Sequence, residues 1–178
     1  MRLSQSRAIS RTAAVYIESI RSTPLLVQLY FFYFGLPTLG IMLPEWVTGV
    51  IALTLNSGAY YAEIIRAGIQ AIAYGQIEAG IASGLNYFQR MRYIILPQAL
   101  GMTIRPMLGQ AIVLVKDSSL LSLISIMELT RAGQMLTSDR FMPTEGFVTT
   151  AAFYLVLYYL LKTFSGWSEK RLIFREAH

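Results

Sequence analysis

Two adjacent charges, Lys116 and Asp117, interrupt an apolar stretch that runs from about residue 94 to residue 127. Charged side chains within a membrane span are costly, and they commonly mark a site of binding or transport where each charge has a partner. The stretch is too long for one simple span, so we expect a break near residues 116–119. A broken span can direct the N-terminus of a half-helix at an anionic group.

The polar residues at this expected break suit the start of a second helix. Asp117, Ser118 and Ser119 are all good N-cap residues for a helix that begins near Leu120. Two interpretations therefore stay open: either Lys116 and Asp117 contact a charged ligand, or they lie at the outer interface and only cap the helix.

A second polar group precedes this stretch. Glu63 lies three residues before Arg66, close enough on a helix to form an ion pair, and an interfacial ion pair is the simpler alternative to a site. Asn56, Ser57 and Tyr60 lie deeper in the same apolar segment. They can line a polar pathway, or they can hold helices together, as small polar residues do in membranes.

The sequence offers little for enzyme chemistry. Its only histidine is His178, it has no cysteine, and it lacks the HExxH, GxxxxGK[ST] and GxSxG motifs. We therefore expect no catalytic residue, no metal site and no cofactor bound to this chain. Without a phosphate-binding loop the chain does not bind ATP in the usual way, so another subunit must supply any energy for transport.

The composition is that of an integral membrane protein. Apolar residues make up 54% of the 178 residues and charged residues only 14%, against about a quarter in soluble domains, and the mean hydropathy is +0.49. The net charge of +5 does not indicate nucleic-acid binding, because the cations flank the apolar segments, where they set membrane topology. These flanking cations are Arg2, Arg7, Arg11, Arg21, Lys162, Lys170, Arg171 and Arg175.

Four apolar segments are candidate membrane spans, at about residues 24–43, 46–65, 97–115 and 146–161. Connections rich in Lys and Arg alternate with poorer ones, which predicts that both termini are cytoplasmic. The predicted fold class is therefore all-α, a multi-span transmembrane helical bundle. Residues 1–23 form a cytoplasmic N-terminal segment and residues 24–178 form the transmembrane domain.

The connection at about residues 76–93 shows helical periodicity. Its apolar residues recur at i, i+4, i+8 and i+11, at Ile77, Ile81, Leu85 and Phe88. This pattern predicts a surface helix with one buried edge. Gly80 and Gly84 are four residues apart, so they would share one face and permit close approach of another backbone. An amphipathic helix that lies on lipid is less favoured, because the polar face carries few cations.

The same connection carries a spaced motif. Glu78-Ala79-Gly80 is followed by Gly84 and, after nine more residues, by Ile94-x-Leu96-Pro97. This spacing resembles the cytoplasmic coupling motif of ATP-binding cassette (ABC) importer permeases. Other stretches resemble the polar amino acid subfamily of these permeases: residues 16–28 (YIESIRSTPLLVQ), 56–69 (NSGAYYAEIIRAGI), 116–120 (KDSSL) and 128–131 (ELTR).

The resemblance implies a fold and a function. The chain would be the membrane-spanning permease subunit of an ATP-driven importer that moves polar amino acids across the cell (inner) membrane. The type I importer fold has a core of five spans, and the first is not seen here, so we expect a truncated product, a different start or a short natural form. Implied partners are ABC ATPase subunits, which would use the ATP, a second permease subunit in a homodimer or heterodimer, an extracytoplasmic amino-acid-binding protein and the lipid bilayer.

The resemblance also implies roles for individual residues. Coupling to the ATPase would involve Glu78, at the start of a short helix, together with Ala79, Gly80, Gly84, Ile94, Leu96 and Pro97. The substrate site or pathway would involve Asn56, Ser57, Tyr60, Glu63, Lys116, Asp117 and Ser119. An amino acid carries an ammonium and a carboxylate. Asp117 would meet the ammonium, and Lys116 or a helix N-terminus would meet the carboxylate.

Two other functions stay open. One is the same machine with a related substrate, such as an opine. The other is a truncated or non-transporting assembly subunit that keeps the docking helix without a complete pathway. The sequence also has Arg105-Pro106 where the family commonly has a Pro-Pro pair. We expect Arg105 to face the bundle interior or a partner subunit, because an arginine in a span needs such a setting.

Overall fold

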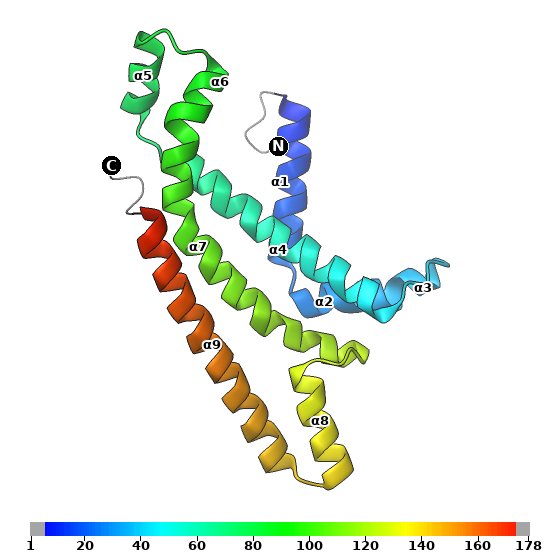
Figure 1. Cartoon of the computed structure of the whole chain (residues 1–178). Helices are drawn as coiled ribbons and strands as arrows, with labels where there is room; N and C mark the ends of the chain where they lie inside the picture. The colour runs from blue at the N-terminus through cyan, green and yellow to red at the C-terminus, as the bar shows by residue number, and fades with distance from the viewer. Residues whose placement is uncertain (1–5, 174–178) are drawn as a thin grey trace.

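The computed structural model describes residues 6–173, and every regular element in that part of the chain is helical (Figure 1). The α-helices are α1 (Arg7–Ser22), α2 (Leu25–Tyr30), α3 (Leu36–Thr38), α4 (Glu45–Gln70), α5 (Tyr74–Ala82), α6 (Tyr87–Arg90), α7 (Leu96–Asp117), α8 (Leu129–Arg140) and α9 (Pro143–Ile173). Two π-helical turns, η1 (Phe31–Gly35) and η2 (Met91–Ile95), and the 3-10 segment η3 (Ser118–Ile124) continue them. The predicted all-α fold class is confirmed.

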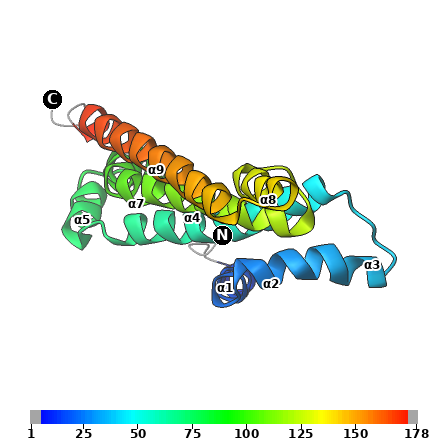
Figure 2. The same ribbon diagram turned by 90° about the horizontal axis from the view of Figure 1, so that it is seen from below.

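The helices form three layers. Helices α4 and α7 pack against each other in the middle, α1 packs on α4 from one side, and α9 packs on α7 from the other (Figure 2). Helices α5 and α6 lie at one end of the molecule, together with the start of α1 and the end of α9 (Figure 1). Helix α8 pairs with α9 at the opposite end. The predicted coupling connection is therefore far from α8 and from the turn that joins α8 to α9.

Each π-helical turn directly precedes a Leu-Pro pair. Proline has no N–H and its ring crowds the carbonyl four residues earlier, and a π-helical turn relieves this clash by widening the helix. The N–H of Leu36 donates to the carbonyl of Phe31, and the N–H of Leu96 donates to the carbonyl of Met91. The second proline therefore lies inside a continuous helix, Tyr87–Ile124, and does not begin a separate one.

Two helices in the described part are long and apolar enough to cross a membrane, Tyr87–Ile124 and Pro143–Ser168. They contain the predicted spans 97–115 and 146–161. Helix α4 contains the predicted span 46–65 and is about 39 Å long, at about 1.5 Å per residue, but its polar residues lower its hydropathy. The predicted span 24–43 is helical only over Leu25–Thr38, about 21 Å, which is shorter than a bilayer core of about 30 Å.

At the predicted break, near residues 116–119, the helix changes from α to 3-10 but does not stop. Helix α7 ends at Asp117 and passes directly into η3, and the chain reverses only at Ser125, which has a left-handed φ of 65°. The hydroxyl of Ser118 donates to the carbonyl of Val115 (2.8 Å), so this serine bonds back into the helix. The prediction that Asp117, Ser118 and Ser119 act as N-caps is wrong, because η3 continues directly from α7 with a helical backbone at Asp117, and the Asp117 side chain makes no capping hydrogen bond.

The α8–α9 hairpin has its own tight packing. The carboxylate of Glu128 caps α8 by accepting from two backbone N–H groups (2.7 and 2.8 Å), and Tyr154 of α9 donates to the same carboxylate (3.0 Å). A Cβ on Gly133 would overlap Oγ1 of Thr150 and would lie 3.2 Å from the carbonyl oxygen of Gly146. Only glycine lets the two helices approach this closely.

Few apolar side chains are buried within the chain. One buried cluster joins Leu29, Ala52 and Ile124, and another joins Ile72, Ile95 and Ala99. Only 6% of the apolar window of α9 is buried, which suits contact with lipid or with a second protein. Arg105 is exposed, so it does not face the interior of this chain.

Candidate functional site: a polar cleft and a docking turn

A polar cleft lies where the α1–α2 junction meets α4 and α7. Its volume is about 610 Å³. It is lined by Arg21, Ser22, Thr23, Pro24, Leu25, Asn56, Tyr60, Gln110, Val113 and Asp117. Seven of these ten side chains carry a polar group. The cleft is therefore suited to a polar ligand.

Buried amides fix the walls of the cleft. Pro24 interrupts the helix after Thr23, which leaves carbonyls at the end of α1 without helical donors. Nε2 of Gln28 supplies donors to the carbonyls of Ile20 (2.7 Å) and Thr23 (3.0 Å). Its Oε1 accepts from Nδ2 of Asn56 on α4 (3.2 Å), and both amides are nearly fully buried. These bonds tie α1, α2 and α4 together.

Arg21 brings a positive charge to one wall. Its guanidinium carbon lies 5.2 Å from the ring centroid of Tyr60, and its Nη1 lies 3.7 Å from Oε1 of Glu63. Glu63 also binds Arg66, whose Nε donates to Oε2 (2.9 Å) and whose Nη2 donates to Oε1. The predicted Glu63–Arg66 ion pair is confirmed, and through Arg21 it reaches the edge of the cleft.

Asp117 brings a negative charge to the wall formed by α7. Lys116 does not join it, because neighbouring side chains on a helix diverge by about 100°. Its Nζ lies 5.9 Å from the ring centroid of Tyr158 on α9, and Nζ of Lys162 lies 5.7 Å from the same centroid. The structure thus separates the two charges that the sequence places side by side.

Three of the residues predicted for the pathway line the cleft together: Asn56, Tyr60 and Asp117. Glu63 adjoins the cleft through Arg21. Ser57 is buried but does not line the cleft. Ser119, like Lys116, lies outside its lining.

The sequence patterns do not single out Arg21, Gln28 or Gln110 as site residues. The first two stand in the stretch of residues 16–28, in which Arg21 is also one of the cations that flank the apolar segments. Arg21 and Gln28 stand on either side of Thr23-Pro24, where the helix is interrupted. This placement is the signal in the sequence that could have identified them. Gln110 precedes Asp117 by seven residues, or two helical turns, so a common face of α7 was also predictable.

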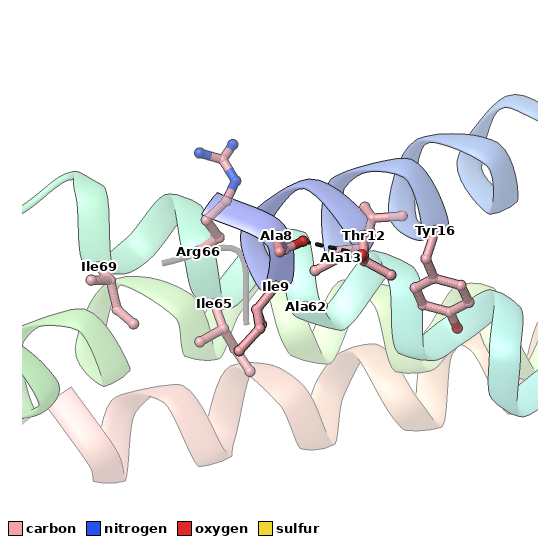
Figure 3. A pocket seen from close by; sticks show the side chains of 10 residues that line it. Ala8, Ile9, Thr12, Ala13, Tyr16, Ala62, Ile65, Arg66 and Ile69 are labelled. Atoms are coloured by element: carbon pink, nitrogen blue, oxygen red, sulfur yellow. Dashed lines mark hydrogen bonds between the residues drawn. The ribbon is translucent and has the colours of Figure 1, made fainter. Parts of the chain in front are cut away.

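A larger groove of about 810 Å³ lies between α1 and α4 (Figure 3). Its walls are mostly alanine and isoleucine, and Arg66 stands at the rim with its guanidinium turned away from Ile65 (Figure 3). Such walls offer contact area but no set of polar groups that would orient a charged ligand. We therefore take the smaller, polar cleft as the candidate site.

The predicted coupling connection is two helices and not one. Helix α5 ends in a Schellman motif, in which the N–H of Leu85 donates to the carbonyl of Gly80 (3.0 Å) and the N–H of Gly84 donates to that of Ile81 (2.9 Å). Gly84 adopts a left-handed φ of 75°, which a residue with a Cβ rarely adopts. The prediction that Gly80 and Gly84 share one helix face is therefore wrong, because Gly84 lies past the end of α5.

Side-chain contacts lock this turn onto α6 and η2. Asn86 and Gln89 form a reciprocal capping box (3.0 and 2.9 Å) at the start of α6. Nη1 of Arg90 donates to the carbonyl of Leu85 (2.6 Å). A Cβ on Gly80 would lie 2.7 Å from Cδ1 of Ile94 and 3.1 Å from the Arg90 side chain. Gly80 thus provides close packing, and Gly84 provides the turn.

The predicted apolar stripe on this connection is not formed. Ile77 packs against a buried cluster, but Ile81 is 54% exposed and Phe88 is 80% exposed. Glu78 lies in the second turn of α5, and the prediction that it begins the helix is wrong. Ala79, Leu96 and Pro97 are exposed, while Ile94 is partly buried. Exposed apolar side chains at this end of the molecule are Tyr74, Ile81, Tyr87 and Phe88.

Comparison with known proteins gives consistent matches. Residues 1–174 match the family described as binding-protein-dependent transport system inner membrane component. The chain is 39% identical to the probable glutamine ABC transporter permease protein GlnM of Bacillus subtilis, over 97% of this chain and 80% of that protein. It is 36% identical to the nopaline transport system permease protein NocM of Agrobacterium fabrum, over 90% of this chain and 71% of that protein. A chain in the crystal structure of an amino acid ABC transporter with histidines superposes with a TM-score of 0.92 at 40% identity, over 96% of this chain and 80% of that one.

Proposed function

The chain belongs to the family of binding-protein-dependent transport system inner membrane components, and from this premise we propose that its polar cleft is an amino acid pathway and its α5–α6 turn docks an ATPase. It is a multi-pass membrane permease subunit of an amino acid importer. We infer that separate ABC ATPase subunits hydrolyse the ATP, and that this chain binds no cofactor. A binding protein would deliver the substrate, and a second permease subunit would complete the pathway.

The presence of both Arg21 and Asp117 in the lining of one cleft is the observation that carries the substrate proposal. A free amino acid has an ammonium and a carboxylate at neutral pH. Asp117 suits the ammonium, and the planar guanidinium of Arg21 suits the carboxylate. Tyr60 and Gln110 also line the cleft and can form hydrogen bonds with a polar side chain. The cleft volume, about 610 Å³, is within the usual range for small-ligand sites.

The docking proposal rests on rigidity and continuity. The α5–α6 turn is held by a Schellman motif and a capping box, and it exposes apolar side chains that suit contact with another protein. Helix α6 continues without interruption through η2 and α7 to Asp117. A displacement of the turn is therefore passed along one helix to the cleft. This function places α5 and α6, with both ends of the described chain, on the cytoplasmic side.

Uptake measurements test the substrate proposal. The chain is reconstituted in proteoliposomes with its ATPase and binding protein, and ATP-dependent uptake of the twenty radiolabelled L-amino acids is measured. We expect uptake of polar amino acids and its loss in Asp117→Asn. Asp139→Asn, on the exposed surface of α8, is the matched control. If Asp117→Asn takes up amino acids as fast as Asp139→Asn does, Asp117 is not part of the pathway.

One relative supports a second candidate substrate class. NocM is named as a nopaline permease, and opines, which are N-substituted amino acids, also carry an ammonium and carboxylate groups. Adding nopaline to the uptake panel distinguishes the two classes. An assembled complex that transports none of these compounds would support the non-transporting alternative.

A further inference from the structure

We propose that Arg66, which does not line the polar cleft, preserves the positive charge that Arg21 presents to the substrate there. This inference rests on the proposed function of the cleft and adds a positioning residue to it. Its basis is the way in which two arginines share one carboxylate.

Two arginines in the described part of the chain hold Glu63 unequally. Arg66, one turn further along α4, makes two contacts with the carboxylate, one to each oxygen. Arg21 reaches it from α1 through one longer contact of 3.7 Å. The side chain of Glu63 is only 17% exposed, so its charge requires a partner in any state of the site. Of the two arginines, Arg66 makes the closer contact with Glu63, and it also donates to Gln70.

The charge balance follows from this sharing. Arg21, Glu63 and Arg66 together carry a net charge of +1, and the excess lies on Arg21, whose contact with Glu63 is the weaker one. Arg21 lies over the ring of Tyr60 and lines the cleft, whereas Arg66 lines the apolar groove between α1 and α4. Glu63 therefore separates a cation that faces the site from one that does not.

Removal of Arg66 would reverse this arrangement. Of the two arginines, Arg21 alone would then remain to pair with Glu63, and a bidentate pair between them would draw the guanidinium away from the cleft and neutralise it. The cleft would lose its carboxylate-binding charge although no residue in its wall had changed. Removal of Glu63 as well would release Arg21 again.

Binding measurements on the assembled permease–ATPase complex, without the binding protein, test this inference. The probes are the twenty radiolabelled L-amino acids, and the tightest binder is then measured in competition with its own α-carboxamide. We expect Arg66→Gln to weaken binding at least tenfold and to reduce the preference for the acid over the amide. Arg66→Lys, which keeps the charge, should bind within threefold of the unaltered chain, and the double variant E63Q/R66Q should bind at least threefold more tightly than R66Q.

The outcomes separate the inference from the proposed function. If the unaltered chain binds no amino acid, the cleft is not a substrate site and both proposals are overturned. If it binds one and R66Q binds equally well, only the role of Arg66 is overturned. If R66Q does not assemble, the double variant decides, and a tenfold loss there would mean that Arg66 acts through structure and not through the charge of Arg21.

Discussion

Substitutions of Gly84 test the docking turn. If the left-handed backbone conformation matters, they should rank differently than if side-chain size matters. Gly84 has a φ of 75°, and a Cβ placed on it would have no atom within 4 Å. A side chain added at Gly84 therefore strains the backbone but clashes with no atom of this chain. The left-handed conformation costs residues with a Cβ about 1–2 kcal/mol, with asparagine more tolerant and β-branched residues less so. The expected order of function is Gly, then Asn, then Ala, then Val.

The magnitude follows from this strain. A cost of about 1–2 kcal/mol lowers the population of the docking conformation by a factor of about 5–30. The capping box and the Arg90–Leu85 bond lie outside the changed residue, so the protein should still reach the membrane. The assay is the number of amino acids transported per ATP hydrolysed in proteoliposomes. We expect Gly84→Val to reduce this ratio at least fivefold and Gly84→Asn to leave it near the original value.

Gly75 provides the matched control. It lies in the first turn of α5, has no left-handed φ, and likewise has open space around its Cβ position. Gly75→Ala should leave the coupling ratio unchanged. A ratio for Gly84→Val equal to that for Gly75→Ala would refute the role of the turn. Equal damage from Gly84→Asn and Gly84→Val would show that side-chain size at the ATPase contact matters, and not backbone conformation.

The remaining predictions concern packing and charge. Asn56→Leu leaves the buried Oε1 of Gln28 without its donor and should lower the free energy of unfolding by about 1–3 kcal/mol. Thr54→Leu changes an exposed residue of the same helix and should have no such effect; thermal unfolding of the purified permease measures both variants. Gly133→Ala should cost about 1–3 kcal/mol by forcing α8 from α9, whereas Gly166→Ala, which meets no atom within 4 Å, should be neutral in the same measurement. Asp117→Asn should lower amino acid uptake at least tenfold with the protein still assembled, and normal uptake would contradict the zwitterion site.

Local sequence patterns predicted the helical class and the location of most apolar segments. They failed where a residue type permits two structures. Asp117, Ser118 and Ser119 favour an N-cap, yet Ser118 bonds back to Val115 within the helix. The following segment stays helical, and Ile124 packs against Leu29 and Ala52. Periodicity over residues 76–93 likewise predicted one helix, although Gly84 and Asn86 carry the turn and cap signals that divide it.

The sequence by itself determined which polar residues stand inside apolar segments and which ion pair forms along α4, because helical spacing fixes contacts between near neighbours. Only the tertiary structure decided which of them meet. The cleft joins Arg21, Asn56 and Asp117 from three distant parts of the chain, and no local pattern sets the distances between them. Lys116 and Asp117 are adjacent, but the packing of α7 on α4 and α9 turns one toward α9 and the other toward the cleft.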